Sequence, residues 1–380
     1  MTKNDREKSP RRRGLIRAAG LALALAWVPA AARADVFAQT NLVSNRTDVG
    51  ATFVDPNLKN PWGISSSATS PMWVSNQVTG NSTLYNSAGT PQALVVTVPG
   101  GSPTGQVSNS SADFALSVNN ANPARFLFAT LSGTIAGWNP SANATNAITM
   151  VQTPGAVYTG LGIGNNGSGN FLYAADTRGG GINVFNGSFA NVTSTVFAGK
   201  FVDPTLPTGF RAYNVQNLNN TLYVTYQNGT LQGGVVDAFD LNGNFLRRIS
   251  ANGAGGILES PWGVAIAPTT WGSFANALLV GNKDDGRISA FNSTTGAFLG
   301  QLSDAQGTPL SNLGLWGLQF GNGGNGGDPN TLYFAAGING ERDGLFGAIR
   351  LVPEPSSIIL LGSGLAIGLA FIRRYAVRSA

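Results

Sequence analysis

The sequence predicts an all-β protein, a six-bladed β-propeller with four strands in each blade, and three observations predict this fold. A short motif containing an aromatic residue recurs along the chain at an even spacing. Each copy is followed by short segments rich in β-branched and aromatic residues, bounded by Gly, Asn or Asp, which is the pattern of strands joined by turns. The composition agrees, because 51 of the 380 residues are Gly and no long amphipathic helical pattern interrupts the repeat.

The recurring motif marks the start of each unit. Three copies contain a clear Trp-Gly pair, and three copies are weaker. The six copies are Pro61–Ile64, Pro261–Val264, Leu315–Leu318, Asp113–Leu116, Gly160–Ile163 and Ala212–Val215. Successive copies are 47 to 54 residues apart, and six units at one period indicate a repeat architecture. A pair of β-sandwiches, the alternative all-β fold, would not explain the even spacing.

Further strands are expected after each motif. The second strands are predicted at Met72–Asn76, Phe126–Thr130, Phe171–Asp176, Thr221–Tyr226, Ala277–Asn282 and Thr331–Gly337. The third strands are predicted to end near Tyr85, Trp138, Phe185, Phe239 and Phe291. The fourth strands are predicted at Ala93–Val98, Ala147–Val151, Ser194–Phe197, Phe245–Ile249 and Phe298–Leu302. Four strands per unit in six units describe a propeller.

The sixth unit has no fourth strand of its own. Its third strand is predicted at Gly344–Leu351, and the chain then enters a different kind of sequence. The segment 36–43 is a strand candidate that lies before the first unit. We therefore expect this N-terminal strand to pair with the last blade and close the ring, because pairing removes an exposed sheet edge.

Residues 1–34 are predicted to be a secretory signal peptide. A basic stretch is followed by an uncharged, Ala-rich run at Ala18–Ala32. Ala32 and Ala34 fit the small-residue rule for cleavage and give a mature N-terminus at Asp35. A retained membrane anchor is the alternative. Because Arg12 is followed by a second Arg, both the general secretory route and the twin-arginine route are open.

The C-terminus, residues 352–380, has three parts in order. Pro353, Glu354 and Pro355 come first, an uncharged run follows at Ser356–Ile372, and Arg373 and Arg374 complete it. The run is just long enough to span a bilayer as a helix. This order resembles the PEP-CTERM sorting signal, and the alternative is an ordinary tail anchor.

The PEP-CTERM resemblance implies how the protein is processed and where it is delivered. It implies recognition by an exosortase-type membrane enzyme and cleavage near Pro353–Pro355. It further implies a transient anchor in the inner membrane, contact with the membrane only through the C-terminal helix, and a final place on the cell surface or in the extracellular matrix of a Gram-negative bacterium. In that family the pathway accompanies exopolysaccharide production.

Residues 35–351 remain for the propeller, and some blades resemble NHL-type repeats. The resemblance rests on Leu172–Thr177 followed by Gly181–Phe185, and on Leu279–Asn282 followed by Arg287–Phe291. The whole chain is similar to uncharacterised exported PEP-CTERM proteins that carry such a propeller. This comparison implies a fold and a cellular destination but no activity.

The composition excludes several function classes. The chain has no His and no Cys, which excludes the usual zinc sites, a Cys nucleophile, a Ser-His-Asp triad and disulfides. Residues 35–351 contain 12 basic and 15 acidic residues, a net charge of −3. The basic excess therefore belongs to the two ends, and nucleic-acid binding is not expected.

A metal site would have to use oxygen ligands, which are the ligands that calcium prefers. Several Asp and Asn residues end second strands or follow them in the next turn, and they could meet at one face of the channel. The candidate metal ligands are Asn76, Asp176, Asn282, Asp284 and Asp285. The alternative is that the last three belong to a solvated hairpin turn. No cofactor is expected, and calcium binding is the one alternative to this expectation.

Trp62, Trp262 and Trp316 of the Trp-Gly pairs have two interpretations. They could form an aromatic surface that stacks on sugar rings. Alternatively, they are core residues between blades, with the following Gly allowing close packing. Asp55 and Asp203 of a repeated Phe-Val-Asp-Pro motif likewise read either as ligands or, preferably, as residues that cap a turn.

We conclude from the sequence that the protein is an exported binding or structural module, not an enzyme, with exopolysaccharide or another glycan as its expected partner. The Asn-, Ser- and Thr-rich propeller suits uncharged partners. The alternative function is a calcium-dependent hydrolase, similar to lactonase-like propellers, with carboxylates around the channel. Asp and Asn clustered at the channel mouth would favour that enzyme.

Overall fold

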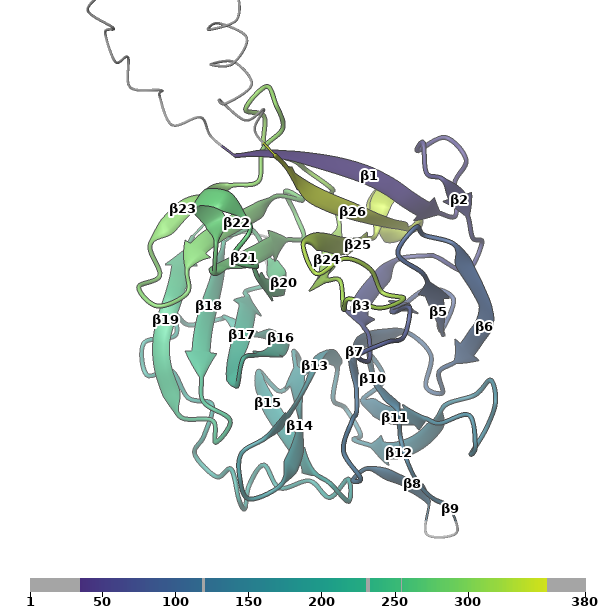
Figure 1. Cartoon of the computed structure of the whole chain (residues 1–380). Coiled ribbons are helices and arrows are strands. Elements are labelled where there is room, and N and C mark those ends of the chain that lie inside the picture. The colour runs from purple at the N-terminus through teal and green to yellow at the C-terminus, as the bar shows by residue number, and fades with distance from the viewer. Residues whose placement is uncertain (1–34, 118–119, 230–232, 254, 354–380) are drawn as a thin grey trace, which may run out of the picture. The chain divides into compact units, whose positions relative to one another are not determined.

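Six antiparallel sheets are arranged in a ring in the computed structural model, which describes residues 35–117, 120–229, 233–253 and 255–353 (Figure 1). Each sheet is one blade, and the first strand of each blade lies nearest the centre of the ring. This arrangement confirms the predicted six-bladed β-propeller.

The strands of each blade are given from the centre outward. Blade 1 consists of β3 (Pro61–Ser65), β4 (Met72–Asn76), β5 (Asn81–Tyr85) and β6 (Pro91–Thr97). Blade 2 consists of β7 (Pro103–Ser108), β10 (Phe126–Thr130), β11 (Thr134–Trp138) and β12 (Ile148–Gln152). Blade 3 consists of β13 (Tyr158–Asn165), β14 (Asn170–Asp176) and β15 (Gly181–Asn186). Blade 4 consists of β16 (Arg211–Leu218), β17 (Thr221–Gln227), β18 (Gly234–Phe239) and β19 (Phe245–Asn252). Blade 5 consists of β20 (Pro261–Ile266), β21 (Ala277–Asn282), β22 (Ile288–Asn292) and β23 (Phe298–Gln301). Blade 6 consists of β24 (Leu315–Phe320), β25 (Thr331–Ala336), β26 (Leu345–Val352) and β1 (Val36–Ser44), with β2 (Phe53–Val54) parallel to β1 at its outer edge. The remaining elements are the hairpin of β8 (Ala115–Ser117) and β9 (Asn120–Pro123), the 3-10 helix η1 (Gly272–Phe274) and the short helix α1 (Ile338–Glu341).

The hydrophobic core lies between neighbouring blades. Each of the six pairs of adjacent blades encloses one cluster of buried apolar side chains. Between blades 5 and 6, for example, Trp271 packs against Phe37 with ring centroids 5.0 Å apart. Because no blade buries both of its faces alone, the ring is the smallest unit that covers them all.

Strand β1 closes the ring. It pairs antiparallel with β26 over the whole length of both strands, with Val36 opposite Val352 and Ser44 opposite Leu345. The Ser44 hydroxyl also donates a hydrogen bond of 2.7 Å to the Gly344 carbonyl. The prediction that the N-terminal strand completes the last blade is therefore confirmed.

Blade 2 begins earlier than the sequence predicts. Its inner strand is β7, whereas Asp113–Leu116 leads into the β8–β9 hairpin, an insertion between β7 and β10. Phe114 is fully buried there and contacts Phe189, with ring centroids 5.4 Å apart. The sequence does not mark the start of this inner strand, because it carries Thr104 where four other units carry an aromatic residue.

Blade 3 has three strands, and the fourth strand predicted at Ser194–Phe197 is wrong. Residues 193–199 form turns instead. Asn191 begins this segment by accepting a hydrogen bond of 3.0 Å from the Thr193 amide at its side-chain oxygen, a local bond that competes with strand pairing. Val192 and Thr193 still bond to Val184 of β15 and cover part of that edge.

The two sorting segments lie mostly outside the described residues. This applies to the signal peptide with Ala32 and Ala34, and to Glu354, Pro355, the apolar run, Arg373 and Arg374 at the C-terminus. Asp35 and Pro353 are the first and last residues described. In the described part of the chain, no helix is long and apolar enough to cross a membrane.

Candidate functional site

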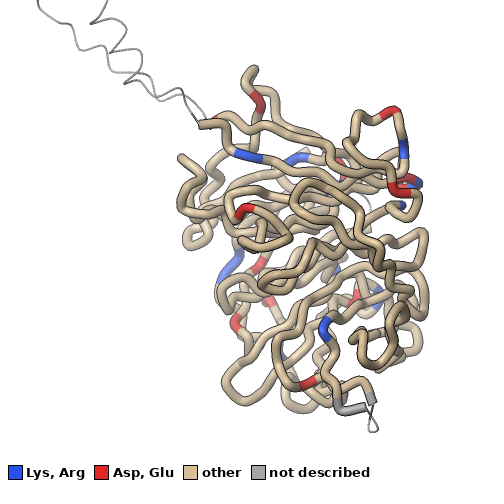
Figure 2. Tube along the Cα trace, turned by 45° about the vertical axis from the view of Figure 1, so that its right-hand side comes forward, with Lys and Arg blue, Asp and Glu red and all other residues tan. Residues whose placement is uncertain are grey.

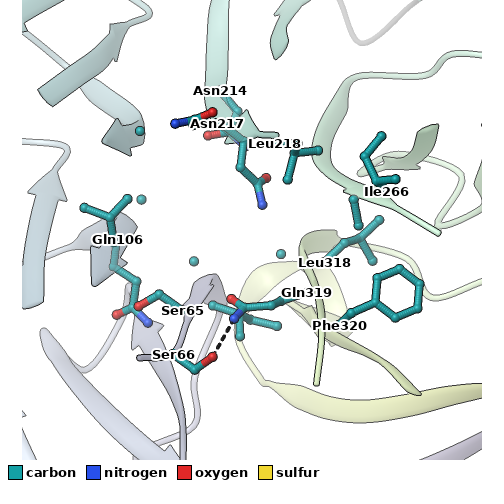
Figure 3. Close-up of a pocket in the computed structure, with 18 of the residues that line it drawn as sticks. Ser65, Ser66, Gln106, Asn214, Asn217, Leu218, Ile266, Leu318, Gln319 and Phe320 are labelled. Atoms are coloured by element: carbon teal, nitrogen blue, oxygen red, sulfur yellow. Dashed lines mark hydrogen bonds between the residues drawn. The ribbon is translucent and has the colours of Figure 1, made fainter. Parts of the chain in front are cut away.

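The six inner strands surround a central channel, and its mouth lies where these strands end. A cavity of about 600 Å³ occupies this half of the channel (Figure 3). It reaches from Trp262 near the start of β20 to Ser66, Asn219 and Thr269 in the loops that follow the inner strands. A volume of this size is typical of pockets for small organic ligands.

The cavity wall combines amide and hydroxyl groups with apolar side chains. Seven of the residues that line it have amide side chains, namely Gln106, Asn214, Gln216, Asn217, Asn219, Asn276 and Gln319. Ser65, Ser66, Ser108 and Thr269 add hydroxyl groups, and Ile64, Ile163, Ile266, Leu318 and Phe320 are among the apolar residues. Among the described residues that line the cavity, none is charged. Figure 2 shows the few charged residues of the propeller scattered along the chain instead of gathered in one patch.

Several of these polar groups are held in place by neighbouring blades. The Gln319 side-chain amide is hydrogen-bonded to Ser66 Oγ at 2.7 Å, across the contact of blades 6 and 1 (Figure 3). Asn217 Nδ2 donates to the Ile163 carbonyl at 2.9 Å, across blades 4 and 3. Asn217 Oδ1 has no hydrogen-bond partner among the described residues. The wall is therefore preorganised, and it keeps polar capacity that the protein does not use itself.

The other half of the channel is filled by aromatic rings. Trp62, Tyr213, Trp262 and Trp316 come from blades 1, 4, 5 and 6 and form one buried cluster, here called the aromatic plug. Trp62 stacks on Trp316 with ring centroids 3.6 Å apart. Trp262 stands edge-on to both, with its centroid 6.0 Å from Trp62 and 5.9 Å from Trp316. The plug forms the floor of the cavity, because Trp262 also lines it.

The plug arises from one position of the inner strand. In all six blades the register between the inner strand and its neighbour is irregular near this position, and such bulges re-aim side chains. Four blades place an aromatic residue there, while blades 2 and 3 place Thr104 and Thr159. The smaller Thr side chains leave room for the large rings. The Thr159 carbonyl accepts a hydrogen bond of 3.0 Å from Trp262 Nε1.

The residue after this position lets neighbouring inner strands approach closely. A Cβ atom on Gly263 would lie 2.2 Å from the Trp316 carbonyl oxygen, and one on Gly317 would lie 2.5 Å from the Trp62 carbonyl oxygen. Only Gly fits such a backbone contact. The repeated Trp-Gly pair therefore combines a side chain for the channel with a contact between blades.

A small ionic cluster lies behind the plug, on the side away from the cavity. Lys283 Nζ is 5.7 Å from the centre of the Trp316 ring and forms ion pairs with Asp284 at 3.0 Å and Glu341 at 3.1 Å. Burial lowers the pKa of Lys283, but the two carboxylates outweigh this effect and raise it overall. Burial also raises the pKa of Tyr213 well above its ordinary value, so its phenol stays neutral.

The five candidate metal ligands lie at this closed end of the channel or beyond it. Asn76, Asp176 and Asn282 are the last residues of their second strands and pair with Pro61, Tyr158 and Pro261, respectively, at the start of the inner strands. They belong to blades 1, 3 and 5, and they lie away from the mouth of the cavity.

Each of these candidates bonds to nearby protein groups, but the buried side-chain oxygens of Asn76 and Asn282 have no hydrogen-bond partner among the described residues. Asn76 Nδ2 donates to Asn81 and Thr83, both at 2.9 Å, and Asn282 Nδ2 donates to the Ile257 carbonyl at 2.8 Å. Asp176 Oδ1 accepts from the backbone amides of residues 157 and 178. Asp284 accepts from Ser260 at 2.5 Å, and Asp285 accepts from the Arg287 amide at 3.0 Å. Within the described part of the chain, no three acidic side chains gather as metal ligands would.

The amide wall of the cavity was missed from the sequence. Gln106 directly follows the Gly of its inner strand, and Gln319 follows two residues after its Gly. A polar amide recurring just after the unit motif is a usable signal for a channel-lining position. This signal is weak beside the Trp and carboxylate side chains, which are the more conspicuous ligand types in the sequence.

The C-terminal residues 351–374 match the PEP-CTERM protein-sorting motif. Together with the fold, this match defines an exported β-propeller protein that is anchored transiently through its C-terminal tail.

The chain is 31% identical over 327 residues to the uncharacterized protein R648 of Acanthamoeba polyphaga mimivirus, covering 81% of this chain and 78% of R648. It is 30% identical over 328 residues to the uncharacterized protein L690 of the same virus, covering 81% and 84%. The chain belongs to the same protein family as R648 and L690.

Solved structures with the same architecture share little sequence with this chain. An auxiliary nutrient binding protein from Bacteroides ovatus has a TM-score of 0.55 at 8% identity, covering 84% of this chain and 78% of that one. Virginiamycin B lyase from Staphylococcus aureus has a TM-score of 0.50 at 12% identity, covering 84% and 100%. At these identities the likeness shows the fold alone.

Proposed function

We propose that the protein is a non-enzymatic binding module of the cell surface or extracellular matrix, and that its channel cavity holds an uncharged glycan of the exopolysaccharide. The observation that carries this proposal is the wall of the cavity, where the described lining includes seven residues with amide side chains and several with hydroxyls but no charged residue. Processing by an exosortase at the C-terminal motif is the expected route to that place.

The chemistry of the wall suits a neutral sugar. Sugars present many hydroxyl groups, which can donate to and accept from amide side chains. They also present apolar C–H faces, which can pack on Trp262, Phe320 and Leu318. An acidic polymer would find no cation in the cavity wall, so uncharged glycans are the expected class.

A matched pair of variants tests the proposal. Gln319→Leu removes an amide from the cavity wall while preserving the size of the side chain. Gln301→Leu is the control, because Gln301 is also half-buried in a strand and bonded to one Ser, 3.2 Å from Ser289, but lies on the outer strand β23. Loss of one hydrogen bond to a ligand is expected to weaken binding by about tenfold, whereas the control should bind as the parent protein does.

Binding is measured by calorimetric titration of the purified propeller with exopolysaccharide from the producing strain. Equal binding by the Gln319→Leu and parent proteins would place the glycan elsewhere. Absence of binding by the parent protein, at concentrations where the folded protein is intact, would refute the proposed function.

The alternative function is a calcium-dependent hydrolase, and it lacks a specific observation in its favour. It would need carboxylates at the cavity, yet Asp176, Asp284 and Asp285 lie away from the cavity wall and are bonded to neighbouring protein groups. A metal bound there would have to displace these partners first.

A further inference from the structure

The channel is closed at the level of the aromatic plug. Blades 1 and 4 face each other across the ring, and their Trp62 and Tyr213 rings have centroids only 6.5 Å apart. Tyr213 also reaches Trp316, with centroids 5.9 Å apart. Leu131 of blade 2 packs against the same cluster. Side chains from opposite sides of the ring therefore meet at its axis, and a glycan chain cannot pass through.

The plug is also fixed in place. Trp316 Nε1 donates to Asn60 Oδ1 at 3.0 Å, and Trp262 Nε1 donates to the Thr159 carbonyl at 3.0 Å. The four aromatic side chains of the plug are at most 8% exposed. Opening the channel would break these bonds and expose the rings to water, which is costly.

Because the plug closes the other end, the described part of the chain leaves the mouth as the side from which the cavity is filled. Ser66, Asn219, Thr269 and Gln319 lie around it and are half-buried or exposed. A polymer that enters here meets the plug partway along the inner strands. An internal stretch would have to bend back through the same opening, whereas a chain end can enter directly.

We propose that the cavity recognises the end of a glycan chain and not a stretch within the chain. This inference rests on the proposed function and makes it more specific. The protein then caps individual exopolysaccharide chains instead of coating them along their length, and each chain end of the matching kind holds one propeller.

The test uses the full propeller and fragments of the producing strain's exopolysaccharide. Partial acid hydrolysis followed by size fractionation gives neutral fragments of short, intermediate and long chain length. Calorimetric titration gives the number of protein molecules bound per fragment chain and the dissociation constant. End recognition predicts one protein per chain at every length and a dissociation constant per chain that changes by less than about twofold.

The Gln319→Leu variant links the result to the cavity. It should weaken binding of every fragment by the same factor, whereas Gln301→Leu should leave all of them unchanged. A number of bound proteins that rises in proportion to chain length would overturn end recognition, and the proposed glycan-binding function would stand. No binding to any fragment or to the intact polymer would overturn both.

Discussion

At the scale of single residues, one position near the start of each inner strand supplies the side chain that points into the channel, and in five of the six blades a Gly follows it. In four blades it supplies a ring to the aromatic plug, and in the remaining two it supplies Thr104 and Thr159. The recurring Trp-Gly pair could be read from the sequence. That Trp62, Trp262 and Trp316 meet at the axis could not, because strand alternation does not reveal where bulges turn a side chain.

The Gly after this position makes a testable contribution to stability. In Gly263→Ala, the new methyl group would lie 2.2 Å from the Trp316 carbonyl oxygen, so the inner strands of blades 5 and 6 must separate. We expect the free energy of unfolding to fall by about 1–3 kcal/mol, as for other overpacked sites. Urea denaturation measures the change.

Gly181→Ala is the matched control. Gly181 is also a strand residue, but a Cβ atom there would meet nothing within 4 Å. Its substitution should change the free energy of unfolding by less than about 0.5 kcal/mol. If both variants were equally stable, close contact between inner strands would not be a determinant of the ring.

At the scale of elements, the predictable strands were those with strong apolar patterns. The second strands and the pairing of the N-terminal strand with Gly344–Leu351 agree with β4, β14, β21 and the β1–β26 ladder. The start of blade 2 could not be predicted, because Thr104-Gly105 lacks the aromatic signal while Phe114 imitates it. The predicted fourth strand of blade 3 was wrong, because Asn191 and Thr193 form a local turn bond instead.

The closing ladder can be tested by a cross-link, since the chain has no Cys of its own. Ala38 and Arg350 are opposite each other in β1 and β26, and both are exposed. Oxidation of the Ala38→Cys, Arg350→Cys double variant should form a disulfide and raise the free energy of unfolding by about 2–4 kcal/mol. Denaturation with and without a reducing agent measures the gain.

The reduced double variant is the control, because it carries the same substitutions without the bond. A chain that stays reduced under oxidising conditions while folded would contradict this register. A bond that forms without stabilising the protein would show that the two ends already stay together in the unfolded chain.

At the scale of the whole molecule, uncharged polar, aromatic and charged side chains lie at different levels along the channel. Uncharged amides surround the open cavity, the aromatic plug fills the middle, and Lys283, Asp284 and Glu341 lie behind it. The sequence predicted the polar, uncharged character of the propeller as an average. It could not predict this separation, because the position of a residue along the channel depends on strand register.

Calcium should leave the stability of the propeller unchanged. The carboxylates of Asp176, Asp284 and Asp285 already accept hydrogen bonds from protein groups, and among the described residues no three acidic side chains gather as metal ligands would. We therefore expect equal melting temperatures in excess calcium and in excess EDTA. A native site would instead add about 2.7 kcal/mol at a calcium concentration one hundred times its dissociation constant, and such a shift would return the hydrolase to consideration.

The seam between β1 and β26 also bears on when the channel cavity is completed. Ser44 and Gly344, bonded across this seam, are 300 residues apart in the chain, so the contact is among the last that a growing or translocating polypeptide can make. The stack of Trp62 on Trp316, which joins blades 1 and 6, likewise brings together segments that are far apart in the chain. Because the inner strands of all six blades line the cavity, it is complete only when the ring has closed.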